Sequence, residues 1–136
     1  MLSNNPILLL EDDIVDVMAI KRALTQLNIS NPLVVKENGE EGLDYLKTHE
    51  ELPGIIFLDI NMPKMNGIEF LTEIKPNERF AQIPVVILTT SNDQQDKLAT
   101  FAKGISGYMI KPVDYSQFKK MLQTIAEYWK LSEHSY

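Results

Sequence analysis

Residues 7–13 read Ile-Leu-Leu-Leu-Glu-Asp-Asp, a short apolar run that ends abruptly in three acidic residues. A continuous apolar run of this length is typical of a β-strand that is buried on both faces of a parallel sheet. Beyond it, apolar residues recur at helical spacing and form one stripe, at Val17, Ile20, Leu24 and Leu27. The opening of the chain therefore predicts a buried strand, an acidic turn and an amphipathic helix.

The same alternation recurs four more times along the chain. The further apolar runs lie at residues 33–35, 55–58, 85–88 and 108–110, and each precedes a segment with helical periodicity. Strands that alternate with helices predict a parallel sheet covered on both faces, because each crossover is right-handed and packs against the sheet. We therefore predict an α/β fold with a doubly wound five-stranded parallel sheet. Ser91 or Asn92 is expected to cap the fourth helix.

The composition places the chain among globular domains and excludes several functions. We predict that residues 1–136 form a single domain, with a core from about residue 6 to residue 131. The net charge of −6 argues against a nucleic-acid partner, and the lack of cysteine excludes disulfides and thiolate metal sites. The sequence has neither a signal peptide pattern nor an apolar segment that could span a bilayer, so we expect a cytoplasmic protein with no membrane partner.

Polar side chains follow four of the five expected strands. Glu11-Asp12-Asp13 follow the first strand, Asp59 the third, Thr89-Thr90-Ser91 the fourth and Lys111-Pro112 the fifth. In open α/β sheets, ligands bind outside the carboxyl ends of the strands, where the strand order reverses. We therefore expect acidic, hydroxyl and cationic groups to meet at this edge of the sheet.

These side chains predict a phosphoryl site. Carboxylates in one pocket repel each other unless a cation lies among them, and Mg²⁺ fits because it takes carboxylates together with water and phosphate oxygens. An aspartate beside the ion, such as Asp59, is a suitable nucleophile toward a phosphoryl donor. Lys111 would balance the charge of the phosphate, and the Thr89 hydroxyl would donate a hydrogen bond to it. The residues alone leave the direction and purpose of the transfer open.

Four segments resemble the receiver domain of bacterial two-component response regulators. They are LLLEDD at residues 8–13, LDINMPKMNG at 58–67, PVVILTT at 84–90 and GYMIKP at 107–112. Each match alone is weak, but all four occur in the family's order and at the ends of the expected strands. The sequence is therefore similar to a stand-alone receiver of the chemotaxis-regulator type. The resemblance implies a flavodoxin-like (βα)5 fold with strand order 2-1-3-4-5. The tail of the sequence, YWKL at 128–131, resembles receivers that partner bacterial phytochrome-type kinases.

The resemblance implies a set of roles for the acidic residues. Asp59 would become an aspartyl phosphate, with the phosphoryl group coming from a sensor histidine kinase or a histidine phosphotransfer protein. Asp12 would bind Mg²⁺ directly, together with Asp59 and the backbone carbonyl of Asn61, while Glu11 would hold the ion through water. Asp12-Asp13 is an alternative acidic pair. Glu11-Asp12 is preferred because the apolar run ends directly before it.

The resemblance also implies a switch. Thr89 would be the switch hydroxyl, and Lys111 would form a salt bridge with the phosphate. The Lys111–Pro112 peptide bond would be cis. Tyr108 would move inward when Thr89 moves toward the phosphate. We expect self-phosphorylation and self-dephosphorylation but no enzyme activity on other substrates. The phosphate would change a protein-interaction surface. The sequence does not name the downstream target of this surface, and a homodimer is one possible outcome.

Two other functions match part of the pattern. A Mg²⁺-dependent phosphohydrolase with an Asp nucleophile, of the haloacid dehalogenase type, requires a second Asp as general acid two residues after Asp59. Asn61 occupies that position and cannot act as an acid. A pseudo-receiver, which binds partners without phosphorylation, would lack one of the pocket residues, and none of them is missing here.

Overall fold

The computed structural model describes residues 4–131. The predicted single domain of residues 1–136 extends past this range, and its terminal residues lie outside the described part of the chain. Five parallel strands form one sheet in the order β2-β1-β3-β4-β5, which confirms the predicted topology. The strands are β1 (Ile7–Leu10), β2 (Leu33–Lys36), β3 (Ile55–Leu58), β4 (Val85–Thr89) and β5 (Gly107–Ile110).

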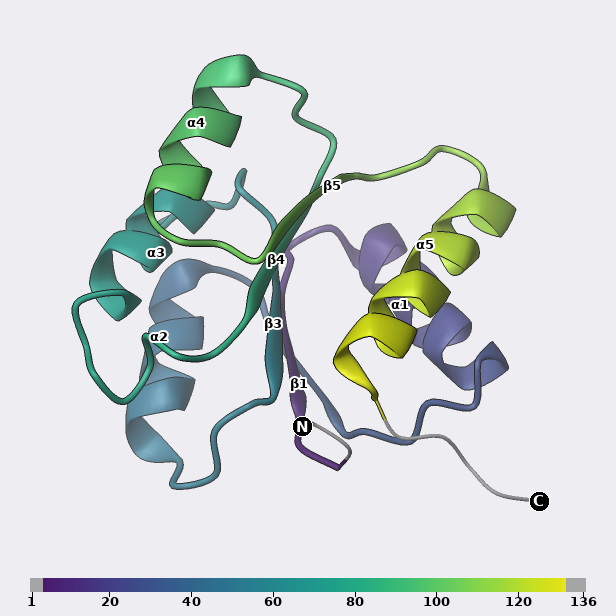
Figure 1. The fold of residues 1–136 in the computed structure, drawn as a ribbon, viewed down its shortest axis with the longest axis horizontal. Coiled ribbons are helices and arrows are strands. Elements are labelled where there is room, and N and C mark those ends of the chain that lie inside the picture. Colours follow the sequence, from purple (N-terminus) through teal and green to yellow (C-terminus); the bar gives the residue numbers. More distant parts are fainter. Residues whose placement is uncertain (1–3, 132–136) are drawn as a thin grey trace.

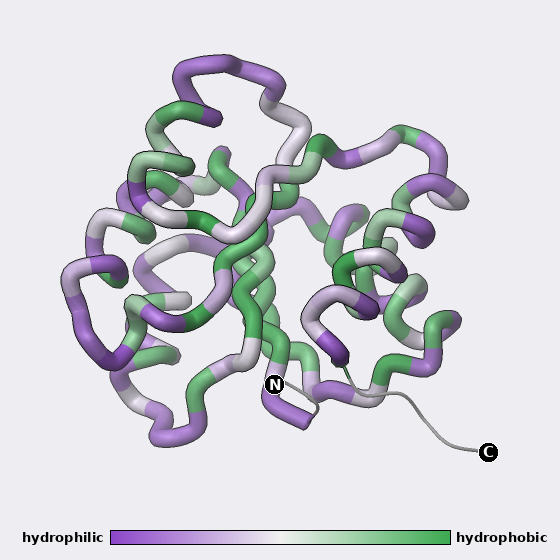
Figure 2. The backbone as a smooth tube through the Cα atoms, in the orientation of Figure 1, coloured by the Kyte–Doolittle hydropathy of each residue, from purple (hydrophilic) through white to green (hydrophobic). Residues whose placement is uncertain are grey.

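Helices cover both faces of the sheet. They are α1 (Ile14–Gln26), α2 (Gly39–Thr48), α3 (Gly67–Ile74), α4 (Gln94–Ala102) and α5 (Tyr115–Trp129). In Figure 1, α1 and α5 lie on one face, and α2, α3 and α4 lie on the other. The strands at the centre carry apolar residues, and the sides of the helices that face away from the sheet carry mostly polar ones (Figure 2). Within residues 4–131, none of the helices has the length and apolar character that crossing a membrane requires.

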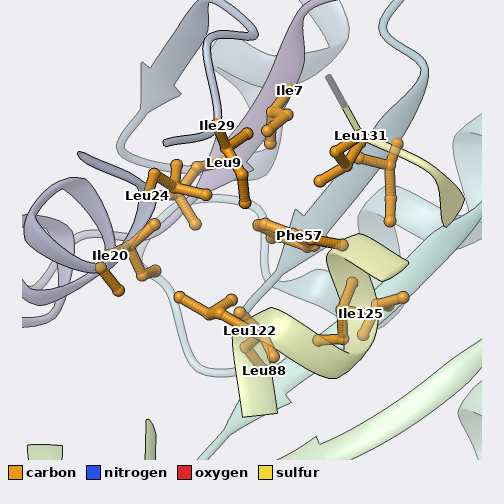
Figure 3. Packing of buried hydrophobic residues seen from close by; sticks show 14 of the residues in the cluster. Ile7, Leu9, Ile20, Leu24, Ile29, Phe57, Leu88, Leu122, Ile125 and Leu131 are labelled. Carbon is orange, nitrogen blue, oxygen red and sulfur yellow. The ribbon is translucent and has the colours of Figure 1, made fainter. Parts of the chain in front are cut away.

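Two hydrophobic cores form because side chains alternate between the faces of each strand. Ile7 and Leu9 enter the core beneath α1 and α5, while Leu8 and Leu10 enter the core beneath α2 and α3. Phe57, which is fully buried, lies among the α1 and α5 side chains of the first core (Figure 3). The strands β1, β3 and β4 are buried throughout, so the residues that directly follow them are held on a rigid base.

One helix start differs from the prediction. The helix α4 begins after Asp93, and not after Ser91 or Asn92, because the Asp93 carboxylate accepts the backbone N–H of Gln95 at 2.7 Å. The Ser91 hydroxyl is engaged elsewhere and donates a hydrogen bond of 2.7 Å to the Asp96 carboxylate. Ser91 is therefore part of the loop between β4 and α4, and it contacts the first turn of the helix.

Candidate functional site

The register of the central strands brings the predicted site residues to one level. Leu10 of β1 pairs with Leu58 of β3, so Glu11 and Asp59 are the next residues on neighbouring strands. The backbone N–H of Asp59 donates to the carbonyl of Leu10 at 3.0 Å and continues the pairing by one step. Lys111 is held in the same way, because its N–H donates to the carbonyl of Thr89 at 2.8 Å.

Three carboxylates meet at this edge of the sheet. Glu11, Asp12 and Asp59 each offer an oxygen atom, and these atoms lie within 4.8 Å of one another. Glu11 and Asp59 are buried, whereas Asp12 is exposed. Hard divalent cations such as Mg²⁺ and Mn²⁺ take oxygen ligands of this kind. The donor set therefore fits a divalent cation, with Asp12 on its solvent side. Asn61 lies two residues beyond Asp59 and is exposed.

Asp13 does not belong to this group. Its carboxylate caps α1 and accepts the backbone N–H of Val15 at 2.9 Å and that of Asp16 at 3.4 Å. The side chain is thereby directed to the start of the helix. The geometry favours Glu11-Asp12 over Asp12-Asp13 as the acidic pair.

Lys111 contacts three carboxylates at once. Its Nζ donates to Glu11 Oε1, to Asp16 Oδ2 at 2.7 Å and to Asp59 Oδ2 at 3.4 Å. Only 7% of the Lys111 side chain is exposed. Burial by itself would lower the pKa of the Lys111 ammonium, but the hydrogen bonds to Asp16 and Glu11 and the charge of Asp59 outweigh it and raise the pKa. Lys111 is therefore a permanent cation beside Asp59.

Glu11 has the most perturbed carboxyl group of the site. Burial raises the pKa of Glu11 to about 7, since the hydrogen bond from Lys111 offsets only part of the lost hydration and the charge of Asp59 adds to the rise. In the metal-free site, this carboxyl group therefore takes up a proton near neutral pH. A cation bound beside it would favour the ionised form.

Thr89 and Tyr108 are joined through a residue that lies between them. Thr89 is fully buried at the end of β4, and its Oγ1 accepts the backbone N–H of Ser91 at 3.2 Å. Tyr108 is half-buried in β5, and its hydroxyl donates to the carbonyl of Ser91 at 2.9 Å. A hydroxyl that accepts one hydrogen bond can still donate another, so Thr89 retains a donor.

The structure adds one residue to the predicted site and corrects one detail. Asp16 was not predicted, although it lies one helical turn beyond the acidic run and its side chain reaches back to Lys111. The Lys111–Pro112 peptide bond is trans, so the expected cis bond is wrong. The trans form of an X–Pro bond is favoured by about 0.5–1 kcal/mol, and with this bond trans Lys111 reaches three carboxylates.

The doubly wound sheet, with two buried carboxylates and a lysine at the ends of its strands, agrees with the family that the sequence matches. The model of the response regulator receiver domain matches residues 7–123, and the chain belongs to this family. The predicted family is thereby confirmed. The site residues Glu11, Asp12, Asp59, Thr89 and Lys111 all lie within the matched range.

Relatives and solved structures cover nearly the whole chain. The Probable methanogenesis regulatory protein FilR2 of Methanothrix harundinacea is 38% identical over an alignment of 127 residues, which covers 90% of this chain and 82% of that protein. Response regulator Rcp1 of Synechocystis is 34% identical over an alignment of 134 residues, which covers 93% of this chain and 91% of Rcp1.

Two solved structures have the same fold. The phosphorylated cyanobacterial phytochrome response regulator RcpA has a TM-score of 0.88 and 31% identity, with 94% of this chain and 95% of RcpA covered. The Mn(2+)-bound form of response regulator Rcp1 has a TM-score of 0.85 and 30% identity, with 96% and 99% covered. The family, the fold and the acidic cluster thus agree on a receiver domain of two-component signalling.

Proposed function

We propose that this chain is a phosphorylation switch that accepts a phosphoryl group on Asp59 in a Mg²⁺-dependent reaction. The observation that carries the proposal is the surroundings of Asp59. Its buried carboxylate lies within 4.8 Å of the Glu11 and Asp12 oxygens and 3.4 Å from the ammonium of Lys111. A carboxylate between a cation site and a fixed positive charge is suited to attack phosphorus while the charges on the phosphoryl oxygens are balanced.

The donor in this proposal is a phosphohistidine on a sensor histidine kinase or a histidine phosphotransfer protein. An Asp59 oxygen forms the new bond to phosphorus, and the bond from phosphorus to the histidine nitrogen breaks. The electron pair stays on that nitrogen, which leaves as neutral imidazole because the other ring nitrogen carries a proton. RcpA is a phytochrome response regulator, and this likeness supports a phytochrome-type kinase as the first donor to test.

Glu11, Asp12, Asp59 and the carbonyl of Asn61 would hold the Mg²⁺, which supplies positive charge beside the phosphoryl group. Lys111 is the second positive charge, and its position is set by β5. The Thr89 hydroxyl would donate to a phosphoryl oxygen. Each of these groups would stabilise the negative charge of about −1.5 to −2 that the phosphoryl group carries.

The output of the switch is a change in a protein-interaction surface formed by α4 and β5. Thr89 connects through Ser91 to Tyr108, and the Tyr108 ring stacks on Phe101 with 6.4 Å between the ring centroids. Phe101 and Leu98 are exposed on α4, at 54% and 61%. A small displacement of Thr89 therefore has a direct route to an apolar surface that a partner protein can bind.

The proposal is tested with Mg²⁺ and a small phosphodonor such as acetyl phosphate or phosphoramidate, followed by intact-mass measurement. We expect the wild type to gain one phosphoryl group, and neither Asp59→Asn nor the wild type with excess chelator to gain any. A folded wild type that gains none would overturn the proposal. Steady turnover on simple phosphate esters would favour the hydrolase alternative. Equal partner binding by the wild type and Asp59→Asn under phosphorylating conditions would favour the pseudo-receiver.

A further inference from the structure

We propose that Asp16 is a positioning residue for the phosphorylation of Asp59, because it holds the Lys111 ammonium back from the Asp59 carboxylate. The inference rests on the proposed function and deepens it. Asp16 lies in the first turn of α1, whereas the other two carboxylates that Lys111 contacts, those of Glu11 and Asp59, directly follow β1 and β3. In the unphosphorylated site it would keep the nucleophile from being neutralised by a close ion pair.

The distances at Lys111 carry the proposal. Nζ lies 2.7 Å from Asp16 Oδ2, which is a normal length for a hydrogen bond between an ammonium and a carboxylate. The distance from Nζ to Asp59 Oδ2 is 3.4 Å, which is much longer than such bonds usually are. An ammonium has three N–H donors. Glu11 and Asp16 engage two of them closely, and the contact with Asp59 is loose.

The consequence follows from charge. If the Asp16 carboxylate is removed, the nearest acceptor for the released N–H is Asp59, and the ammonium can close the gap. A tight ion pair lowers the electron density that the Asp59 oxygen offers to phosphorus and competes with a cation for the same carboxylate. The rate of phosphorylation should therefore fall. The lifetime of the phosphorylated form should not shorten, because Lys111 remains available to pair with the phosphoryl oxygens.

A simpler role for Asp16 would be to stabilise the N-terminus of α1 through the helix dipole. It also adds one negative charge to the edge of the sheet. Asp13 shares both properties, since it lies at the same helix start, but its carboxylate is directed to the backbone N–H groups of Val15 and Asp16. Asn caps a helix as well as Asp does. The Asp13→Asn variant is therefore a matched control for Asp16→Asn.

The test compares phosphorylation rates with acetyl phosphate and Mg²⁺ in the wild type, Asp16→Asn, Asp13→Asn and Asp16→Glu, each checked for folding by circular dichroism. We expect Asp16→Asn to be slower than Asp13→Asn by about tenfold, the kinetic equivalent of about 1.4 kcal/mol. Asp16→Glu keeps the charge and should restore most of the rate. The lifetime after removal of the donor should be no shorter in Asp16→Asn than in Asp13→Asn.

A double-mutant cycle with Lys111→Met separates the contact from a general effect. In the Lys111→Met background, Asp16→Asn should change the rate no more than Asp13→Asn does, because no ammonium is left to reposition. Equal rates for the two Asn variants in the Lys111 protein, or a faster Asp16→Asn, would overturn this inference and leave the proposed function standing. A folded wild type that takes up no phosphoryl group would overturn both.

Discussion

The Tyr108 hydroxyl donates a 2.9 Å hydrogen bond to the backbone carbonyl of Ser91, which lies 17 residues earlier in the chain. The N–H of Ser91 donates to Thr89 Oγ1, and its hydroxyl donates to the Asp96 carboxylate. Three of the polar groups of Ser91 thus connect β4, β5 and α4. A movement of the Thr89 side chain is therefore coupled to the loop at the start of α4 and to the ring of Tyr108.

The Tyr108→Phe variant should loosen this connection without removing the ring. Phe keeps the stacking on Phe101 but leaves the carbonyl of Ser91 without its donor, at a cost of about 1 kcal/mol in the free energy of unfolding. We expect faster amide hydrogen exchange across residues 90–93, with the phosphorylation rate on Asp59 nearly unchanged. Unaltered exchange in this loop would show that the hydrogen bond does not order it.

Gly67 lies close against the backbone of Asp59, the proposed phosphoacceptor. A Cβ at this position would lie 2.5 Å from the carbonyl oxygen of Asp59 and 2.9 Å from the Cα of Ile60. In an open helix position, Gly→Ala stabilises by roughly 0.5–1 kcal/mol, but displacement of packed backbone costs about 1–3 kcal/mol. The cost of the clash should therefore exceed the gain in helix propensity. We expect Gly67→Ala to lower both the stability in denaturant and the phosphorylation rate.

The matched control for this variant is Gly107→Ala. A Cβ on Gly107 would meet the Val86 methyl groups at 3.9 Å, an ordinary contact distance. We expect this variant to keep the wild-type phosphorylation rate. If Gly67→Ala retained that rate as well, the close approach of Gly67 would be irrelevant to the position of Asp59.

Arg79 closes the C-terminal end of α2 from a loop more than thirty positions away. Its guanidinium donates to the carbonyls of Leu46, His49 and Glu50, at 3.1, 2.6 and 2.9 Å. A lysine has no planar fork and cannot reach all three carbonyls, so Arg79→Lys should lower the free energy of unfolding by about 1 kcal/mol. Denaturant titration measures this loss. The site is remote, so the phosphorylation rate should stay at the wild-type level.

The sheet and the charged edge could be predicted because their signals are local. Each buried strand is a run of apolar residues, and Glu11, Asp59 and Lys111 each stand directly after such a run. Once parallel pairing is inferred, residues that follow neighbouring strands must meet. No knowledge of side-chain directions is needed for this step.

The contacts that were missed depend on side-chain directions and on distant segments. Asp16 and Lys111 are 95 positions apart, and Arg79 donates hydrogen bonds to backbone carbonyls that lie 29 to 33 positions earlier in the chain. Asp16 is one of several acidic residues near the start of α1, and the sequence pattern alone does not distinguish its role from that of Asp13. The structure distinguishes them, because Asp13 caps the helix and Asp16 reaches the lysine.

The raised pKa of Glu11 predicts that Mg²⁺ binding depends on pH. Burial raises the pKa of Glu11 to about 7, against a value of 4.5 for the unperturbed group. For a carboxyl group whose pKa is raised by folding, the contribution to stability is complete below the unperturbed pKa and is lost as the pH rises through the raised one. The metal-free wild type should therefore lose stability as the pH rises from about 4.5 to about 7, relative to Glu11→Gln.

A bound cation requires the ionised carboxylate, so it displaces the proton that Glu11 holds below its pKa. The Mg²⁺ affinity of the wild type should rise by about tenfold from about pH 6 to about pH 8, which is the change expected for one group with a pKa near 7. Calorimetric titration in two buffers of different ionisation enthalpy measures the released proton directly. Glu11→Gln has no proton to release, so its heat of binding should be the same in both buffers after the other carboxylates are fully ionised. An affinity in the wild type that does not change with pH would contradict the raised pKa and place the charge of Glu11 outside the cation site.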